Sequence, residues 1–191
     1  MLLEKLSNAF GPSGCEDNVR RILARALRDK VDDLQVDAIG NLIAFKRGTG
    51  PEPRLKVMLD AHTDEVGFMV TRIEKSGMLG FRVVGGIDPR LLLAKRVLVG
   101  DKRLPGVIAA APVHLTKPKD RQQVIQIEQM VIDVGAGSED EAKKLAGIGD
   151  YAAFATRFET LTTEGLRTVK GKAFDDRAGC TVAALLAEET Y

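Results

Sequence analysis

A short apolar segment, Leu55–Leu59, constrains the fold of this 191-residue chain more than any other stretch of its sequence. Four of its five residues are apolar, which is typical of a strand buried on both faces of a parallel sheet. A polar segment, residues 60–65, follows it directly and contains His62 and Asp64. Because α/β proteins tend to place their chemistry at the carboxyl ends of buried strands, the sequence predicts an α/β fold with a candidate site just after this strand.

Helical patterns on both sides of this strand fit the same fold class. Apolar residues recur at helical spacing over residues 2–10 and again over residues 19–27, and each pattern predicts a helix. Residues 178–189 are rich in alanine and leucine and predict a further helix. Ser13 and Glu16 precede the second helix with the spacing of a capping box, in which the serine side chain accepts a hydrogen bond from the first turn.

The rest of the chain favours strands. Residues 34–45 alternate in polarity and predict a hairpin with its turn near Ala38–Asn41. Within residues 68–164 the strand candidates are 68–70, 81–83, 96–99, 106–108 and 131–134. Many short strands separated by glycine and proline predict a compact β-barrel or sandwich. One helix is expected inside this region, at Ser138–Leu145, with Ser138 as its N-cap.

Composition gives no reason to expect nucleic acid or a membrane as partner. The formal net charge is only +1, and 45% of the residues are hydrophobic. Basic residues cluster at Lys117, Lys119 and Arg121, but Pro118 and Asp120 interrupt them, so we interpret this stretch as a solvated loop. No apolar run approaches the ~20 residues that a membrane-spanning helix needs.

The termini and the cysteines favour a cytoplasmic protein. Glu4 and Lys5 stand where a signal peptide would need an unbroken apolar stretch. Cys15 and Cys180 are far apart in the sequence and do not form a CxxC motif. We therefore expect reduced thiols, with Cys180 as a core thiol in the last helix.

The pair His62 and Asp64 is the first candidate for chemistry. Alternate residues of an extended chain point to the same side, so the two side chains can reach each other. A metal-binding imidazole usually donates its second N–H to a carboxylate, which fixes the tautomer. Asp60 and Glu65 add negative charge that favours a cation. The alternative is a polar loop that happens to contain one histidine.

The second candidate is the pair Asp175 and Asp176, which opens the last predicted helix. A two-metal hydrolytic site needs a carboxylate that bridges the ions and terminal ligands such as histidine. His62 and Asp175 have the right chemistry, and we expect them to converge on one cleft. The alternative is that either aspartate merely caps the helix, with Arg177 as a surface partner.

Several motifs stand out along the chain: 9–14 (Ala-Phe-Gly-Pro-Ser-Gly), 37–41, 58–68, 132–138 with Gly149-Asp150, and 171–179. Together they resemble the M42 family of metallopeptidases, the glutamyl and deblocking aminopeptidases that assemble into tetrahedral shells. The resemblance implies that His62 is a metal ligand, that Asp64 is the catalytic-site carboxylate that orients it, and that Asp175 bridges two divalent ions, zinc or cobalt. It also implies that the bond between Asp175 and Asp176 is often cis.

The resemblance further implies an incomplete metallopeptidase (phosphorylase/hydrolase-like) α/β domain with an inserted β-barrel-like domain. Residues 1–67 and 165–191 would form the partial α/β catalytic domain, and residues 68–164 the inserted oligomerisation domain. The implied activity is removal of N-terminal residues from peptides by a two-metal-activated water. The implied partners are peptide substrates and further copies of the chain.

The family's general-base glutamate and its remaining ligands have no match in this sequence. Glu188 and Glu189 lie only a short distance after Asp175, and we interpret them as a solvated helix face. His114 is expected to be structural. The resemblance therefore implies an N-terminal portion with weak or no metal occupancy and negligible activity by itself, and an apolar sheet edge that lowers solubility.

Two other functions remain open from the sequence. The chain could act as a non-catalytic assembly module, because the β-rich region is complete in itself. A weaker alternative is an endoglucanase-like glycoside hydrolase, since some relatives carry that label. A glycosidase needs two carboxylates that flank a sugar, and the adjacent residues Asp175 and Asp176 suit that geometry poorly.

Overall fold

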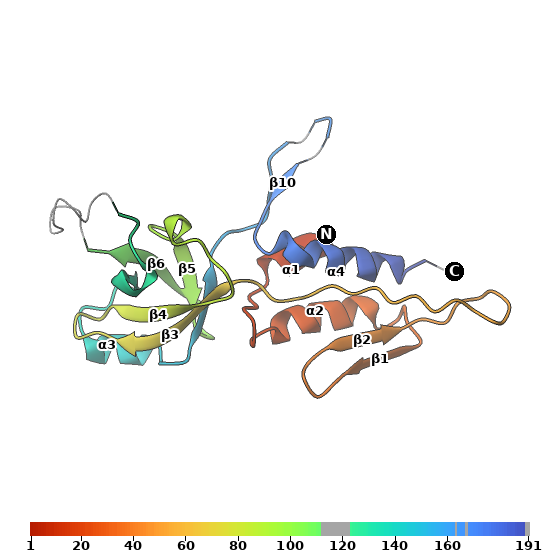
Figure 1. Ribbon diagram of the computed structural model, residues 1–191, viewed down its shortest axis with the longest axis horizontal. Helices are drawn as coiled ribbons and strands as arrows, with labels where there is room; N and C mark the ends of the chain where they lie inside the picture. The colour runs from red at the N-terminus through yellow and green to blue at the C-terminus, as the bar shows by residue number, and fades with distance from the viewer. Residues whose placement is uncertain (112–122, 163, 167, 190–191) are drawn as a thin grey trace. The chain divides into compact units, whose positions relative to one another are not determined.

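A computed structural model describes residues 1–111, 123–162, 164–166 and 168–189, and the chain divides into two compact units (Figure 1). The first unit combines Met1–Asp64 with Arg157–Tyr191, and the second is Glu65–Thr156. The expected inserted domain, 68–164, thus overlaps the second unit but extends into a hairpin that belongs to the first. The predictions for His114 and for the basic loop at 117–121 fall outside the described residues.

Three helices form the core of the first unit. Its elements are α1 (Leu2–Asn8), α2 (Asp17–Leu27), β1 (Asp33–Val36), β2 (Leu42–Phe45), β9 (Glu159–Thr160), β10 (Val169–Lys170) and α4 (Phe174–Leu186). The three predicted helices are confirmed. Their apolar faces meet in one cluster, whose buried members are Leu6, Val19, Leu23, Leu27, Cys180 and Ala184. Cys180 is a core thiol, as expected.

The predicted hairpin at 34–45 is also confirmed. Strands β1 and β2 pair antiparallel, and residues 37–41 form the turn. The Asp37 carboxylate accepts hydrogen bonds from the backbone N–H groups of Asn41, at 2.8 Å, and Ile39, at 3.1 Å. These bonds, with the one from the Asn41 side-chain amide, hold the pKa of Asp37 below its usual value. The turn is therefore fixed by a side chain that must be ionised.

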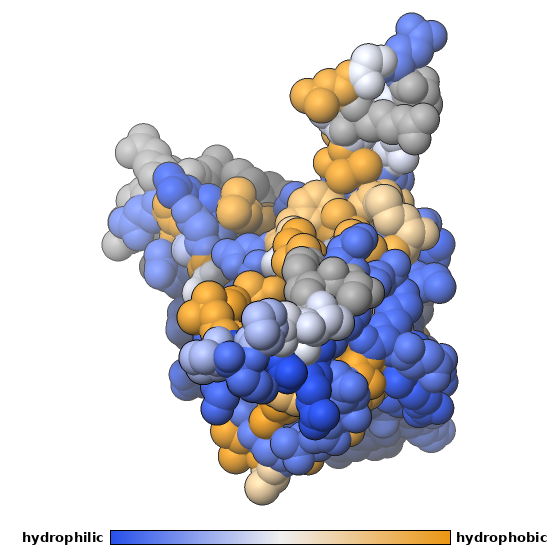
Figure 2. Space-filling model, turned by 90° about the vertical axis from the view of Figure 1, so that its right-hand side faces the viewer, coloured by the Kyte–Doolittle hydropathy of each residue, from blue (hydrophilic) through white to orange (hydrophobic). Residues whose placement is uncertain are grey.

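The predicted strand at Leu55–Leu59 does not form. Figure 1 draws this segment as an extended chain without a strand arrow, and the described residues offer it no hydrogen-bonded neighbour. Leu55, Val57, Met58 and Leu59 are 88%, 74%, 86% and 59% exposed. The apolar pattern identifies a segment that is suited to a buried strand. A β-strand forms, however, only where a second strand hydrogen-bonds with it. Figure 2 shows apolar side chains at the surface among polar ones on one face of the molecule.

The second unit is a closed six-stranded barrel with strand order β3-β4-β7-β6-β5-β8. Its elements are β3 (Gly67–Ile73), β4 (Leu79–Val84), η1 (Pro89–Leu91), β5 (Arg96–Val99), β6 (Leu104–Ala110), η4 (Ile127–Gln129), β7 (Met130–Asp133), α3 (Glu139–Leu145) and β8 (Tyr151–Phe154). The predicted barrel, its five strands and the helix capped by Ser138 are confirmed. Phe68 packs edge-on against Phe81 and Phe154, with ring centroids 5.1 and 5.2 Å apart, in the centre of the core.

Strand β8 was missed by the sequence patterns. Ala152 and Ala153 form its middle, and alanine is a poor strand former by itself. Both are fully buried, because β8 closes the barrel between β3 and β5, where small side chains fit. Among the described residues, no helix is both long and apolar enough to cross a bilayer.

Candidate metal centre

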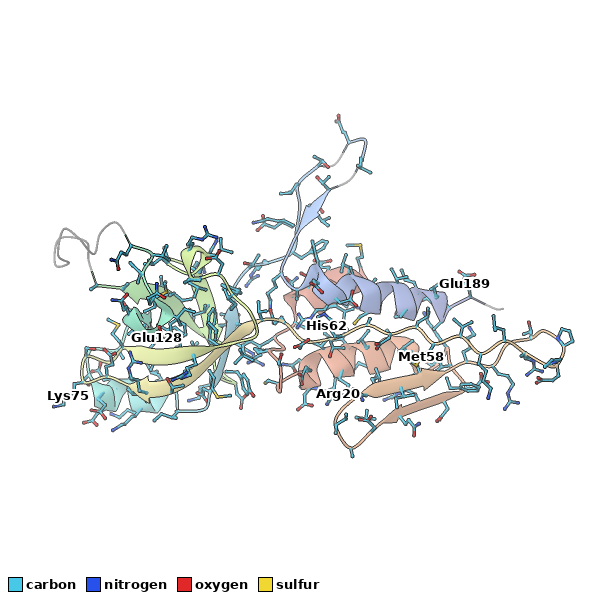
Figure 3. The ribbon with its side chains drawn as sticks, in the orientation of Figure 1. Arg20, Met58, His62, Lys75, Glu128 and Glu189 are labelled. Atoms are coloured by element: carbon cyan, nitrogen blue, oxygen red, sulfur yellow. The ribbon has the colours of Figure 1, made fainter. Side chains whose placement is uncertain are left out.

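The side chains of His62, Asp64 and Asp175 form a chain of contacts in the first unit. The His62 imidazole lies 2.8 Å from Asp64 through its Nδ1 atom and 3.1 Å from Asp175 through its Nε2 atom. Figure 3 labels His62 on the extended segment that precedes the barrel. Residues 62 and 175 are 113 positions apart in sequence, yet their side chains converge. The imidazole is 58% exposed, so a small ligand can reach it from solvent.

The two carboxylates raise the affinity of the imidazole for a proton. Partial burial alone would lower the pKa of His62, but hydrogen bonds to Asp64 and Asp175 outweigh it and raise the pKa above its usual value. The pKa of Asp64 moves the other way. Burial would raise it, but hydrogen bonds from the Ser13 hydroxyl and from His62 lower it. The site therefore favours a cation between the carboxylates.

The adjacent carboxylates of Asp175 and Asp176 have different partners. Their peptide bond is cis, as the resemblance implied, and both residues depart from helical backbone angles. The N-cap position of α4 is Ala173, without a side-chain capping bond, but Asp176 accepts a hydrogen bond from the Gly179 N–H at 3.1 Å and so caps the regular part of the helix that follows it. The Asp175 side chain is 97% exposed and faces His62 instead. Helix capping, the alternative for either residue, thus applies to Asp176.

Arg177 is not the surface residue that the capping alternative assumed. Its side chain is fully buried. Its guanidinium donates to the backbone carbonyls of Leu6, Ala9 and Thr63 at 2.8, 2.7 and 2.9 Å. These bonds satisfy carbonyls at the end of α1 and hold the backbone between His62 and Asp64. Sequence reasoning missed this role, because a charged residue in the first turn of a helix is usually solvated and nothing local reveals which distant carbonyls lack donors.

Cys180 also contacts the backbone of the segment that carries His62. Its thiol donates to the His62 carbonyl at 3.2 Å. Burial, with the nearby Asp176 charge, raises the pKa of the thiol to about 11. It therefore stays protonated at neutral pH and acts as a structural donor.

The donor types at this site suit a divalent transition metal. Imidazole nitrogen and carboxylate oxygen are the ligands that zinc and cobalt accept. Asp64 contacts Nδ1 of His62, whereas Asp175 contacts Nε2. Asp64 therefore orients the imidazole and lies on the other side of the ring from Asp175. Across the described part of the chain, no three His, Cys, Asp or Glu side chains are grouped to hold one ion. His62 and Asp175 could therefore hold an ion only as part of a larger set of ligands.

The paired glutamates do not extend this set. Helix α4 ends at Leu186, so Glu188 and Glu189 follow the helix and do not lie on its face as predicted. Glu188 instead forms an ion pair with Lys30, which follows α2.

Comparisons with known proteins identify the family. The profile of the M42 glutamyl aminopeptidase family matches residues 40–191. The chain belongs to the M42 family. A putative aminopeptidase of Acetivibrio thermocellus is 37% identical over 188 residues, which cover 98% of this chain and 53% of that protein. The lysyl aminopeptidase of Pyrococcus furiosus is 33% identical over 172 residues, which cover 87% of this chain and 49% of that protein.

Solved structures of similar proteins share the fold at similar coverage. A TET aminopeptidase from a marine sediment archaeon superposes with a TM-score of 0.91 and 35% identity, over 98% of this chain and 52% of that one. TET1 peptidase of Pyrococcus horikoshii, which can assemble into a tetrahedron or a large octahedral shell, gives 0.83 and 38%, over 100% and 57%. A Thermotoga maritima protein described as an endoglucanase gives 0.80 and 42%, over 97% and 53%. The chain thus spans about half the length of the M42 relatives it matches.

Proposed function

We propose that this chain contributes His62, Asp64 and Asp175 to the centre of a metal-dependent aminopeptidase that removes N-terminal residues from peptides. The observation that carries the proposal is the continuous contact from Asp64 through His62 to Asp175. His62 and Asp175 would be ligands, with Asp175 exposed enough to reach two ions, either zinc or cobalt. When bound, such ions supply Lewis-acid activation of water and of the scissile carbonyl.

Each of the three residues has a defined task in this proposal. Asp64 would accept a hydrogen bond from the Nδ1–H group of His62 and leave the Nε2 lone pair available to a metal. Because the pKa of His62 is raised, a proton would compete with a metal for Nε2 more strongly than at an ordinary histidine. Asp175 lies 3.1 Å from Nε2 of His62, so its carboxylate would be placed to bind a metal held by that nitrogen.

We further propose that this chain by itself binds metal weakly and has negligible peptidase activity. Two ligands do not hold a pair of ions tightly, and the described residues group no third His, Cys, Asp or Glu with them to hold an ion. The resemblance also finds no match in this sequence for the family's general-base glutamate. Turnover of aminoacyl substrates by protein free of contaminating peptidases, with added Co²⁺ or Zn²⁺, would contradict this part of the proposal.

Metal binding tests the ligand assignment directly. Titration with Co²⁺, followed by paramagnetic broadening of the His62 ring signals, should show binding that weakens about 10-fold or more in Asp175→Ala. In His62→Ala, the Co²⁺-dependent broadening of backbone amide signals around residue 62 should disappear. Asp88→Ala is the matched control, because that carboxylate pairs with Arg90 in the barrel. Equal affinity in Asp175→Ala and the parent chain would contradict the assignment.

A second candidate function is assembly through the barrel. The barrel is closed and has its own core, so it does not depend on a working metal centre. The shells formed by Pyrococcus horikoshii TET1 peptidase make self-association a specific expectation. Native mass measurement of the purified chain would test it, and a monomer at all concentrations would exclude it.

The geometry offers little support for a glycosidase. Asp176 is engaged by the Gly179 N–H, and it adjoins Asp175 in the chain. Retaining and inverting glycosidases separate their two carboxyl groups by about 5–9.5 Å across a sugar. The endoglucanase description of the Thermotoga maritima neighbour therefore has no counterpart in this pair of residues.

A further inference from the structure

The hydroxyl of Ser13 has a long-range partner where the sequence predicted a local one. As part of a capping box it would bond to the first turn of α2. The N-cap of α2 is instead Glu16, without a side-chain capping bond, and Glu16 accepts from the Gly14 N–H at 2.6 Å. The Ser13 hydroxyl donates to Oδ2 of Asp64, 51 positions away in sequence. Asp64 thus receives Ser13 on one oxygen and His62 on the other.

The loop that carries Ser13 is tightly constrained. The Cys15 N–H donates to the Pro12 carbonyl at 2.8 Å, and Gly14 takes a left-handed conformation with φ of 88°. A Cβ atom at Gly11 would lie 2.7 Å from the Val19 side chain. The loop therefore follows a close path that only glycine permits at this position, and Ser13 has little freedom to move away from Asp64.

One guanidinium holds both partners of this contact. Arg177 donates to Ala9, four residues before Ser13, and to Thr63, the neighbour of Asp64. Because the guanidinium is planar and rigid and its side chain is fully buried, it fixes the two backbone segments relative to each other. The separation of Ser13 from Asp64 is thus set by the fold and not by loop motion.

This arrangement decides which nitrogen of His62 carries its proton. When the imidazole is neutral, Asp64 and Asp175 compete for a single N–H. The Asp64 side chain is 31% exposed and is held by Ser13, whereas that of Asp175 is 97% exposed and solvated. Asp64, the better-ordered and closer carboxylate, should therefore accept this hydrogen bond. The proton then lies on Nδ1, and the Nε2 lone pair faces Asp175.

We propose that Ser13 is a positioning residue of the metal centre: it orients Asp64 so that the neutral His62 ring keeps its proton on Nδ1 and presents Nε2 to a metal. The relevance of this role to catalysis rests on the proposed function. The orientation itself does not, because it is a property of the metal-free chain and can be measured there.

The tautomer of His62 is the decisive measurement. The chain has only two histidines, so ¹⁵N-histidine labelling gives assignable ring signals, recorded above the imidazole pKa in metal-free protein. Nδ1–H should dominate in the parent chain. Ser13→Ala should shift the population toward Nε2–H, and Ser13→Thr, which keeps the hydroxyl, should restore Nδ1–H. Ser138→Ala removes the capping hydroxyl of α3 in the other unit and should leave the His62 tautomer unchanged.

Metal affinity provides the second readout. Ser13→Ala should weaken Co²⁺ binding at His62 by about 10-fold, as expected when an outer partner of a ligand is lost, while Ser138→Ala should not. An unchanged tautomer in Ser13→Ala, or a parent chain in the Nε2–H form, would overturn the proposal. If Ser13→Ala shifts the His62 tautomer but the parent chain binds no Co²⁺, the positioning role is supported and the proposed metal function is refuted.

Discussion

At the residue scale, His62 should titrate at higher pH than an isolated histidine. Its two carboxylate partners favour the protonated ring, so the folded-state pKa lies above 6.5. The stabilisation from this pairing is fully present below pH 6.5 and is lost as pH rises through the raised pKa. NMR titration of metal-free protein should show a midpoint above 6.5 that falls in Asp64→Asn and persists in Asp88→Asn. A midpoint at or below the ordinary value would contradict the contacts described for His62.

Arg177 should be among the most sensitive positions in the first unit. Replacing it by methionine keeps much of the buried volume but removes a charged donor from four backbone carbonyls, of which that of Ala9 keeps another charged donor, Lys172. Each such loss costs about 1–3 kcal/mol, so the free energy of unfolding should fall by about 3 kcal/mol or more. Arg21→Met is the control, since Arg21 is exposed on α2, and it should change stability by less than about 0.5 kcal/mol. Equal effects of the two changes on urea unfolding would contradict the role of Arg177.

Single residues differ in how well their roles can be predicted from the sequence. His62 and Asp175 stand in motifs whose chemistry can be recognised without coordinates, and their side chains do meet. Ser13 and Arg177 were both given local roles, in a helix cap and at the surface, because local spacing was the only information. Their partners lie 51 and more than 100 residues away, and only the folded chain brings them together.

At the element scale, the start of α4 depends on the absence of a side chain at Gly179. A Cβ atom there would lie 2.4 Å from the Asp176 carboxylate. Helix propensity alone would favour alanine by about 1 kcal/mol, but the collision with the capping carboxylate should dominate and destabilise Gly179→Ala by about 1–3 kcal/mol. In an Asp176→Ala background the collision is absent, so the same change should be neutral or stabilising. A double-mutant cycle by thermal unfolding measures this, and additive effects would contradict the explanation.

Elements were predictable where a local pattern and the final environment agree. The helices and the β1–β2 hairpin follow from periodicity and turn residues within one short segment. Leu55–Leu59 has the pattern of a buried strand, but its hydrogen-bonding partners would have to come from elsewhere, and the described residues supply none. Strand β8 shows the converse, since its small residues become a strand only because the barrel has to close there.

At the scale of the whole molecule, the exposed Leu55–Leu59 segment should limit solubility. It combines unpaired backbone groups with four large apolar side chains that are more than half exposed, which makes it a template for association with other chains. Val57→Lys places a charge in this run, and because Val57 is 74% exposed the substitution should leave thermal stability nearly unchanged. Light scattering at increasing concentration should show less association than in the parent chain.

Ile39→Lys separates this effect from a general gain in charge. Ile39 is 86% exposed and lies outside this run, at the tip of the β1–β2 hairpin, where the turn is closed by the Asp37 carboxylate. An isolated apolar side chain buries little area on contact, whereas a run of four offers a continuous strip with an open strand edge. Val57→Lys should therefore reduce association more than Ile39→Lys at the same net charge. Equal reductions would show that charge alone controls solubility and that the segment has no special role in association.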